Sequence, residues 1–320
     1  MFSVLLNLIF SVILTKADWP QVEREYFIAP IAETVEIIPQ SGGDQVYAGR
    51  LKSAADKPVA PKKINQNSLG VEVTALSGLA VDWDSGKVLW EKNSGEKRSL
   101  ASLTKLMTAL VFLEHNPGWD KEVEITAEDQ REGGANFFLV GETTTVRDLF
   151  YSTLIGSINC SAVALARSTG LSEADFARAM QQKAKALDLV SAIFVEPTGL
   201  LDGNQATAED TIKLLRAALG NTAIGNATTL GSYEVNILNK NSKRTVSNTD
   251  WLLGGFLNQS PYSILGGKTG YIDNAGYCLG LGVERGGRRV LSVMLGSNSL
   301  ENRFQDTKAV VDWIFRNYQW

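Results

Sequence analysis

Hydrophobic positions between residues 102 and 115 recur every three or four residues. Apolar side chains at this spacing line one face of an α-helix, and they are Leu103, Leu106, Met107, Leu110 and Val111. Ser102 and Lys105 lie one turn apart at the start of the same helix, so their side chains project from about the same side. The sequence therefore predicts an amphipathic helix that presents a serine and a lysine together at its first turn.

Other hydrophobic patterns divide the rest of the chain. Alternating or β-rich runs predict strands at residues 71–83, 87–92, 277–284 and 289–297. Helical periodicity predicts helices at residues 146–155, 159–168, 172–187, 207–219 and 302–318. Turn residues at 84–86 and 285–288 predict hairpins, and capping boxes at Ser172 and Thr207 mark two helix starts. Strands at both ends of a helical middle predict an α/β domain of the α+β type, with one sheet and an inserted helical lobe.

The N-terminus has the pattern of an export signal. An apolar run at residues 2–14 precedes small residues near Ala17, and it is short for a membrane span. Because no Lys or Arg precedes the apolar run, we predict either a signal peptide or an uncleaved anchor at residues 1–17. Residues 18–67 are mixed in character and contain several prolines, which predicts a poorly ordered linker. The folded domain is expected at residues 68–320.

The composition argues against several classes of function. The 320 residues are 44% hydrophobic, enough for one large or two modest cores. A net charge of −4 without a basic cluster argues against nucleic-acid binding. The only histidine, His115, leaves no multi-histidine zinc site and is expected at a helix C-terminus; we predict no metal. Cys160 and Cys278 are too few for a disulfide framework, and we expect them to be buried and near each other.

Ser102 and Lys105 suit nucleophilic catalysis. A serine hydroxyl becomes a good nucleophile when a nearby base takes its proton. A lysine can be that base when its pKa falls, and both burial and a helix N-terminus disfavour the ammonium form. The Ser102 N–H, free at the first turn, can also stabilise an oxyanion. The same Ser-x-x-Lys spacing occurs at Ser94 and Lys97, but no apolar periodicity follows, so we interpret that segment as a solvated loop.

Two further motifs complete a candidate site. Ser157-Ile158-Asn159 lies between two predicted helices, where Ser157 can relay a proton to a leaving group and Asn159 can bind a substrate peptide group. Lys268-Thr269-Gly270 enters the C-terminal strands. The positive charge of Lys268 would bind a substrate carboxylate and lower the pKa of Lys105, and Thr269 adds a hydroxyl.

These three motifs, in this order, resemble those of the penicillin-recognising serine enzymes. The chain is most similar to the D-alanyl-D-alanine carboxypeptidases, the low-molecular-mass penicillin-binding proteins. The supporting segments cover residues 101–109, 141–151, 248–253 and 267–279. The resemblance implies a β-lactamase/transpeptidase-like fold with a mostly antiparallel sheet flanked by helices. It extends from about residue 68 to the end of the sequence and identifies this region as a DD-peptidase catalytic domain.

The resemblance implies acyl transfer without a cofactor. Ser102 attacks the penultimate D-alanine carbonyl of a peptidoglycan stem peptide, with Lys105 as base and Ser157 as proton donor to the leaving D-alanine. Asn159, Lys268 and Thr269 bind the substrate, and the N–H groups of Ser102 and Tyr271 hold the oxyanion. β-Lactam antibiotics are then covalent inhibitors.

Several expectations stay open at this point. A DD-endopeptidase acting on cross-linked peptidoglycan, a β-lactamase and a non-catalytic peptidoglycan-binding protein are the alternatives. Glu196-Pro197 resembles the Glu-Pro of class A β-lactamases, although Glu196 can simply open a turn over residues 197–199. Cys160 stands where many relatives carry an acidic residue, which is expected to alter the cleft rim. Longer relatives add a β-rich domain and a C-terminal anchor after the catalytic domain, so we expect any membrane tether in the N-terminal segment.

Overall fold

The structure, a computed structural model, describes residues 59–133 and 137–320. The expected signal or anchor at residues 1–17 and most of the expected linker at residues 18–67 lie outside the described residues. Within the described part of the linker, strand β1 (Lys62–Lys63) pairs antiparallel with β13 (Tyr318–Gln319). Residues 62–63, which lie within the expected linker, are therefore held by backbone pairing with residues 318–319.

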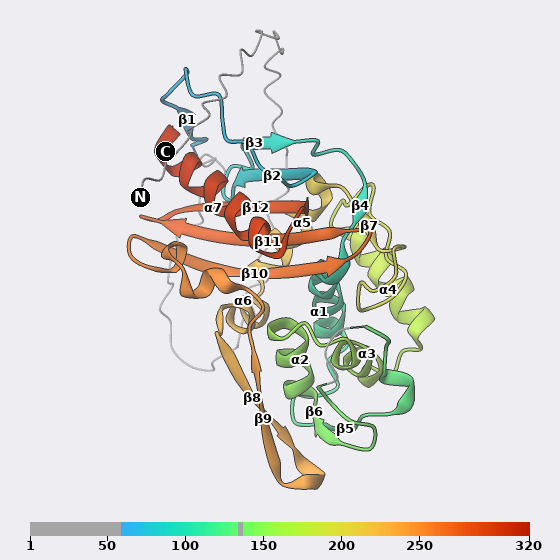
Figure 1. Cartoon of the computed structure of the whole chain (residues 1–320). Coiled ribbons are helices and arrows are strands. Elements are labelled where there is room, and N and C mark those ends of the chain that lie inside the picture. The colour runs from blue at the N-terminus through green and yellow to red at the C-terminus, as the bar shows by residue number, and fades with distance from the viewer. Residues whose placement is uncertain (1–58, 134–136) are drawn as a thin grey trace, which may run out of the picture.

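A five-stranded antiparallel sheet lies at the centre of the fold (Figure 1). Its order is β10-β11-β12-β2-β3. The strands are β2 (Ser77–Asp82), β3 (Val88–Lys92), β10 (Tyr262–Ile272), β11 (Gly276–Arg285) and β12 (Arg288–Ser297). β2 pairs with β12, for example Val81 opposite Leu291, so both ends of the domain build one sheet. The predicted hairpins are confirmed, and so is a main sheet completed by both ends of the domain. The described residues also form four two-stranded sheets that the sequence did not predict.

Successive side chains on a strand point to opposite faces of a sheet, and here helices cover both faces, so both sets of side chains are buried. On β2, Leu79 and Val81 pack in the cluster that includes α5 (Ala208–Gly220). Ala80, between them, packs with Val310 and Ile314 of α7 (Leu300–Asn317). Figure 1 shows α7 on one face of the sheet and α5 on the other. This two-sided burial explains why the strands read as continuous hydrophobic runs.

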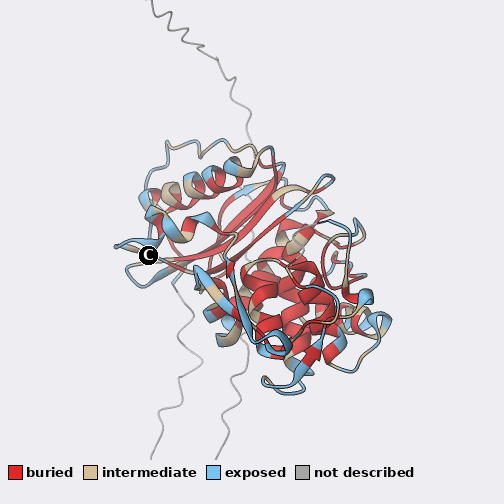
Figure 2. Cartoon of the chain, turned by 60° about the horizontal axis from the view of Figure 1, so that its bottom comes forward, coloured by how far each residue is buried: buried red, intermediate tan, exposed pale blue. Residues whose placement is uncertain are grey.

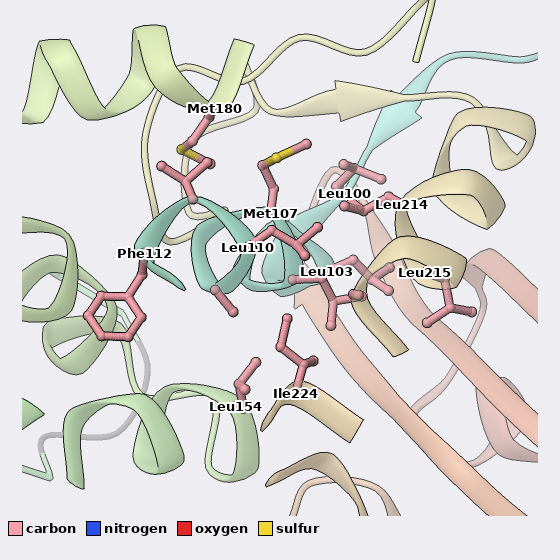
Figure 3. Close-up of a cluster of buried hydrophobic side chains, with 14 of the residues drawn as sticks. Leu100, Leu103, Met107, Leu110, Phe112, Leu154, Met180, Leu214, Leu215 and Ile224 are labelled. Carbon is pink, nitrogen blue, oxygen red and sulfur yellow. The ribbon is translucent and has the colours of Figure 1, made fainter. Parts of the chain in front are cut away.

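The inserted lobe is built around α1 (Thr104–Glu114), which follows the 3-10 turn η1 (Ala101–Leu103). Figure 3 shows its side chains enclosed by residues from α2, α4, α5 and α6, among them Leu154, Met180, Leu214, Leu215 and Ile224. Residues 104–112 of α1 are all buried. The prediction of a helix is confirmed, but its amphipathic character is wrong: helices surround α1, so it has no solvent-facing side in this stretch. His115 is its C-cap, as expected.

Helical periodicity correctly predicted three further helices, α2 (Val146–Ile155), α3 (Asn159–Ser168) and α4 (Glu173–Ala186). Another helix, α6 (Thr222–Thr229), has no counterpart among the predicted helices. The hydroxyls of Ser172 and Thr207 accept hydrogen bonds from the N–H of Asp175 and Asp210, so both predicted helix starts are confirmed. The short elements are β4 (Arg98–Ser99), β5 (Glu122–Glu124), β6 (Thr143–Thr145), β7 (Gln205–Ala206), η2 (Ala127–Asp129), η3 (Leu238–Lys240), η4 (Trp251–Gly254) and η5 (Phe256–Asn258).

The sequence pattern did not predict α6 or the hairpin of β8 (Ser232–Ile237) and β9 (Ser242–Ser247). The hairpin packs against α2, and the Tyr233 hydroxyl donates to Asp148 at 2.8 Å. Figure 2 shows burial concentrated in the sheet and in the lobe interior, with exposed residues along the outer loops. Over residues 59–133 and 137–320, no helix is both long enough and apolar enough to cross a membrane.

Candidate active site

The loop that carries Ser102 is held in an unusual backbone conformation at the start of α1. Ala101 has φ of +46°, in the left-handed region that residues with a Cβ rarely adopt. Leu100 N–H donates to the Asn204 carbonyl at 2.9 Å, which ties this loop to the segment after α4. Gly199 packs so closely that an ideal Cβ there would lie 1.8 Å from the Ala101 carbonyl oxygen. The approach of Gly199 therefore helps to fix the backbone next to Ser102.

Lys105 joins Ser102 to the second motif. Its Nζ lies 2.8 Å from Ser102 Oγ, 2.8 Å from Asn159 Oδ1 and 2.7 Å from the Thr198 carbonyl oxygen. The side chain has no exposed surface. Burial lowers the pKa of Lys105 to about 7, and the negative charge of Glu196 opposes that shift. An amine with this pKa is substantially neutral at neutral pH and can accept the Ser102 proton.

Asn159 occupies the first position of α3 and has a fixed amide orientation. Its Oδ1 accepts from Lys105, and its Nδ2 donates to the Gly133 carbonyl at 2.9 Å. Ser157 lies two residues earlier, in a left-handed conformation with φ of +58°. In the described part of the chain, no hydrogen bond joins the Ser157 hydroxyl to Ser102 or Lys105. The structure thus connects Ser102, Lys105 and Asn159 directly, and it places Ser157 on the adjoining loop.

The Lys-Thr-Gly motif passes beside the serine loop on β10. An ideal Cβ on Gly270 would be 3.0 Å from Ser102 N, so the glycine permits this close approach. Lys268 is 1% exposed, and its Nζ donates to the Thr269 carbonyl at 3.0 Å. Thr269 Oγ1 lies 2.5 Å from Thr249 Oγ1. The lack of a side chain at Gly270 therefore allows the Lys-Thr-Gly motif to lie against the loop that carries Ser102.

The expected electrostatic role of Lys268 needs correction. Burial, rather than the Lys268 charge, is what lowers the pKa of Lys105. Burial, followed by the charges of Lys105 and Arg303, holds the pKa of Lys268 well below its usual range. Because burial and the charge of Lys105 both disfavour the ammonium form of Lys268, an anion that enters the site would favour that form.

Tyr271 lies at the exposed end of the motif strand. Its side chain is 46% exposed and stacks on Tyr277, with ring centroids 4.3 Å apart. The Tyr271 hydroxyl donates to Asp273 at 2.8 Å. Because Gly270 passes so close to the backbone of Ser102, the N–H groups of Ser102 and Tyr271 belong to neighbouring segments.

The structure adds groups that the sequence did not indicate. Arg303 of α7 is 5% exposed and donates to the Gly270 carbonyl at 3.3 Å, from behind the motif strand. Asp250 is also buried, which raises the pKa of its carboxyl to about 6. The Thr198 carbonyl is a backbone group, so no side-chain pattern signals its contact with Lys105. Within the described residues, no cluster of three or more His, Cys, Asp or Glu side chains could hold a metal ion.

Glu196 opens the turn over residues 197–199, which was one of the two interpretations of the Glu196-Pro197 pair. Its Oε2 accepts from Thr198 N and Thr198 Oγ1, both at 2.6 Å. Its Oε1 accepts from Gly199 N at 2.5 Å and from Asn204 Nδ2 at 2.8 Å. The turn interpretation is confirmed, and all four contacts come from residues of the same segment.

One smaller expectation is confirmed in part, and another is corrected. Residues 95–97 form an exposed loop, as expected, but Ser94 itself is 8% exposed and its hydroxyl bonds to Glu91 at 3.2 Å and Glu209 at 3.1 Å. Cys160 is 3% exposed, which places it in the core and not at the cleft rim. Cys160 and Cys278 are both buried and free, as expected, and burial raises the pKa of each thiol.

We predict that Gly199→Ala will slow acylation by about a hundredfold, since misplacing reacting groups by about an ångström has effects of that size. The new methyl group must displace Ala101, next to Ser102. Gly141→Ala is a matched control, because Gly141 has the same φ of +82° but nothing within 4 Å of its Cβ position. Only the left-handed strain of about 1–2 kcal/mol applies there. Denaturant unfolding and penicillin-labelling rates check both variants; equal labelling rates would contradict the role of Gly199.

Comparisons with known proteins agree on one family. The sequence model described as D-alanyl-D-alanine carboxypeptidase matches residues 61–299. The carboxypeptidase DacF of Bacillus subtilis is 32% identical over 252 residues, which cover 77% of this chain and 63% of that protein. A D-alanyl-D-alanine endopeptidase of Pseudomonas aeruginosa is 30% identical, with 82% of each chain covered. The chain thus spans less than two thirds of the first relative's length and most of the second's.

The solved structures that resemble this chain include DD-transpeptidases and penicillin-binding proteins. A Streptomyces DD-transpeptidase superposes with a TM-score of 0.70 at 26% identity, covering 78% of this chain and 100% of that one. A penicillin-binding protein from Listeria monocytogenes with cefotaxime bound gives a TM-score of 0.67 at 28% identity, covering 78% and 100%. The expected β-lactamase/transpeptidase-like fold is confirmed by these similarities.

Proposed function

Because the chain belongs to the D-alanyl-D-alanine carboxypeptidase family, we propose that it is a serine DD-carboxypeptidase acting on peptidoglycan stem peptides. The observation that carries this proposal is the contact between Lys105 Nζ and Ser102 Oγ at 2.8 Å, made by a buried amine whose pKa is about 7. A nucleophile and a base within hydrogen-bond reach are the minimum that acyl transfer requires.

The reaction begins with attack on the substrate carbonyl. Lys105 takes the Ser102 proton while Oγ bonds to the carbonyl carbon of the penultimate D-alanine. The oxyanion that forms is held by the N–H groups of Ser102 and Tyr271, each worth about 3 kcal/mol in comparable sites. The terminal D-alanine carboxylate lies toward Lys268 and Thr269, and Asn159 holds the peptide group.

Collapse of this intermediate breaks the peptide bond. Its nitrogen receives a proton through Ser157, and D-alanine leaves as the free amino acid. Water then attacks the acyl-serine ester, giving the shortened peptide and restoring the Ser102 hydroxyl. Residues of this chain and water supply every atom and proton that these steps need.

β-Lactams fit the same site as covalent inhibitors. Ser102 opens the lactam ring, but the ring nitrogen stays attached to the acyl group and cannot diffuse away. We infer that the protein works outside the cytoplasmic membrane, where peptidoglycan lies, and that residues 1–17 serve as signal or anchor. N-terminal sequencing of the mature protein distinguishes cleavage from retention; cytosolic protein that keeps Met1 or Phe2 contradicts export.

A DD-endopeptidase is the second candidate. Endopeptidases from Pseudomonas aeruginosa and Escherichia coli match 82% and 84% of their own lengths, more than the 63% matched in the carboxypeptidase DacF. The same catalytic groups serve both reactions. The reactions differ in the leaving group, which is the part of the substrate on the C-terminal side of the scissile bond.

Product analysis separates the two candidates. The purified protein is incubated with a stem pentapeptide and, separately, with a cross-linked dimer. We expect D-alanine release from the pentapeptide to be the faster reaction. Faster cleavage of the dimer would establish the endopeptidase, whereas turnover of neither would favour a non-catalytic peptidoglycan-binding role. Ser102→Ala controls for contaminating hydrolases.

A further inference from the structure

Glu196 is a buried charged residue that no step of the proposed reaction uses. It is 4% exposed, and both of its carboxylate oxygens accept hydrogen bonds from the 196–204 segment. The amide orientation of Asn204 is fixed, because its Oδ1 accepts from the N–H of Val195 at 2.7 Å and its Nδ2 donates to Glu196. All four contacts to the Glu196 carboxyl are therefore donors, the pattern that an acceptor-only carboxylate satisfies.

The turn that Glu196 organises accepts two hydrogen bonds from helix α1. The Thr198 carbonyl accepts from Lys105 Nζ at 2.7 Å, and the Pro197 carbonyl accepts from Thr108 Oγ1 at 2.6 Å. Lys105 and Thr108 are three residues apart, so they project from one face of the helix. A turn that loosens would therefore release the amine from one of its three partners.

Charge gives Glu196 a second influence on the same amine. The charged groups that face Lys105 are Glu196, from this turn, and Lys268, from β10. Burial lowers the pKa of Lys105, and the Glu196 carboxylate raises it. A neutral residue at position 196 leaves the burial effect unopposed, so the Lys105 ammonium loses its proton at lower pH.

We propose that Glu196 is a positioning residue for the acylation step, which holds the turn at residues 196–199 against α1 and keeps Lys105 a strong enough base. It acts through Lys105 and does not touch the substrate. The proposal rests on the proposed function, since it requires Lys105 to accept the Ser102 proton. This role differs from the β-lactamase alternative, in which Glu196 would activate the water that frees the enzyme from penicillin.

The test is the pH dependence of acylation by a fluorescent penicillin in Glu196→Gln. The rate rises with pH as Lys105 becomes neutral, so the midpoint of the rise reports its pKa. We expect the midpoint to move down by about one pH unit, and the plateau to fall roughly tenfold, because a weaker and less constrained amine is a poorer base. Stopped-flow labelling across the pH range in which the protein stays folded measures both.

Two variants separate this role from a general loosening of the turn. Thr108→Val removes the neighbouring bond to Pro197 but keeps the carboxylate, so its midpoint stays at the wild-type value. Glu196→Asp keeps the charge and shortens the side chain, so its midpoint stays close to wild type while its plateau falls. If Glu196→Gln does not fold, Glu196→Asp still decides the positioning role, which an unchanged plateau would contradict.

The outcomes also separate this inference from the proposed function. An unshifted midpoint in folded Glu196→Gln, or an equal shift in Thr108→Val, overturns the role of Glu196 alone. Rapid multiple turnover of penicillin that Glu196→Gln abolishes overturns it too, and makes the protein a β-lactamase. Wild-type protein that forms no adduct with penicillin at any pH refutes the proposed acylation chemistry instead.

Discussion

Ser102→Ala is expected to abolish both covalent labelling by a fluorescent penicillin and D-alanine release. The substitution removes the oxygen that forms the acyl bond, and losing a catalytic serine costs roughly a million-fold in rate. Removing it leaves Lys105 with its bonds to Asn159 and Thr198, so the fold is preserved. Gel fluorescence after incubation with the labelled penicillin, together with an assay for free D-alanine, measures both losses.

Ser94→Ala is the matched control for this experiment. Ser94 has the same spacing to Lys97 as Ser102 has to Lys105, but its hydroxyl is bonded to Glu91 and Glu209. Flanking carboxylates do not favour an attacking alkoxide, since they place negative charge beside it. We expect wild-type labelling in Ser94→Ala. Undiminished labelling in Ser102→Ala would refute the assignment of the nucleophile.

The sequence predicted best those helices whose apolar residues recur at helical spacing between clear boundaries. The observed bounds of α2 and α3 match the predicted 146–155 and 159–168. It failed for α6, whose residues Thr222–Thr229 are mostly small and polar and bury only three side chains. It also failed for the β8–β9 hairpin, whose Asn241 turn in the left-handed conformation lacks the glycine that usually marks such a turn.

The candidate site was predictable to the extent that its chemistry lies in side chains within short motifs. Ser102, Lys105 and Asn159 meet because η1, α1 and α3 begin at the same point of the lobe. The contribution of Thr198 is a backbone carbonyl, which any residue could supply, so no residue type signals it. Arg303 lies in a helix far along the chain, and only the packing of α7 on the sheet brings it to Gly270.

Lys105→Ala is expected to lower the acylation rate by about three orders of magnitude, within the range that general-base catalysis supplies. Without the amine, the Ser102 hydroxyl keeps its proton at neutral pH. In the wild-type protein, acylation is expected to rise with pH through about 7, because the pKa of Lys105 is about 7 and the neutral amine is the active form. The variant should lose this rise, which a pH series of labelling rates measures.

Arginine at each of the two buried lysine positions distinguishes a base from a cation. A guanidinium stays charged at all accessible pH values, so it can donate hydrogen bonds but cannot accept the Ser102 proton. Lys105→Arg should therefore be as inactive as Lys105→Ala. Lys268→Arg, in contrast, should retain part of the wild-type labelling, because the proposed role at position 268 is to attract a carboxylate. Acylation of Lys105→Arg at the wild-type rate would show that this position supplies charge alone, and the proton of Ser102 would then have to leave by another route.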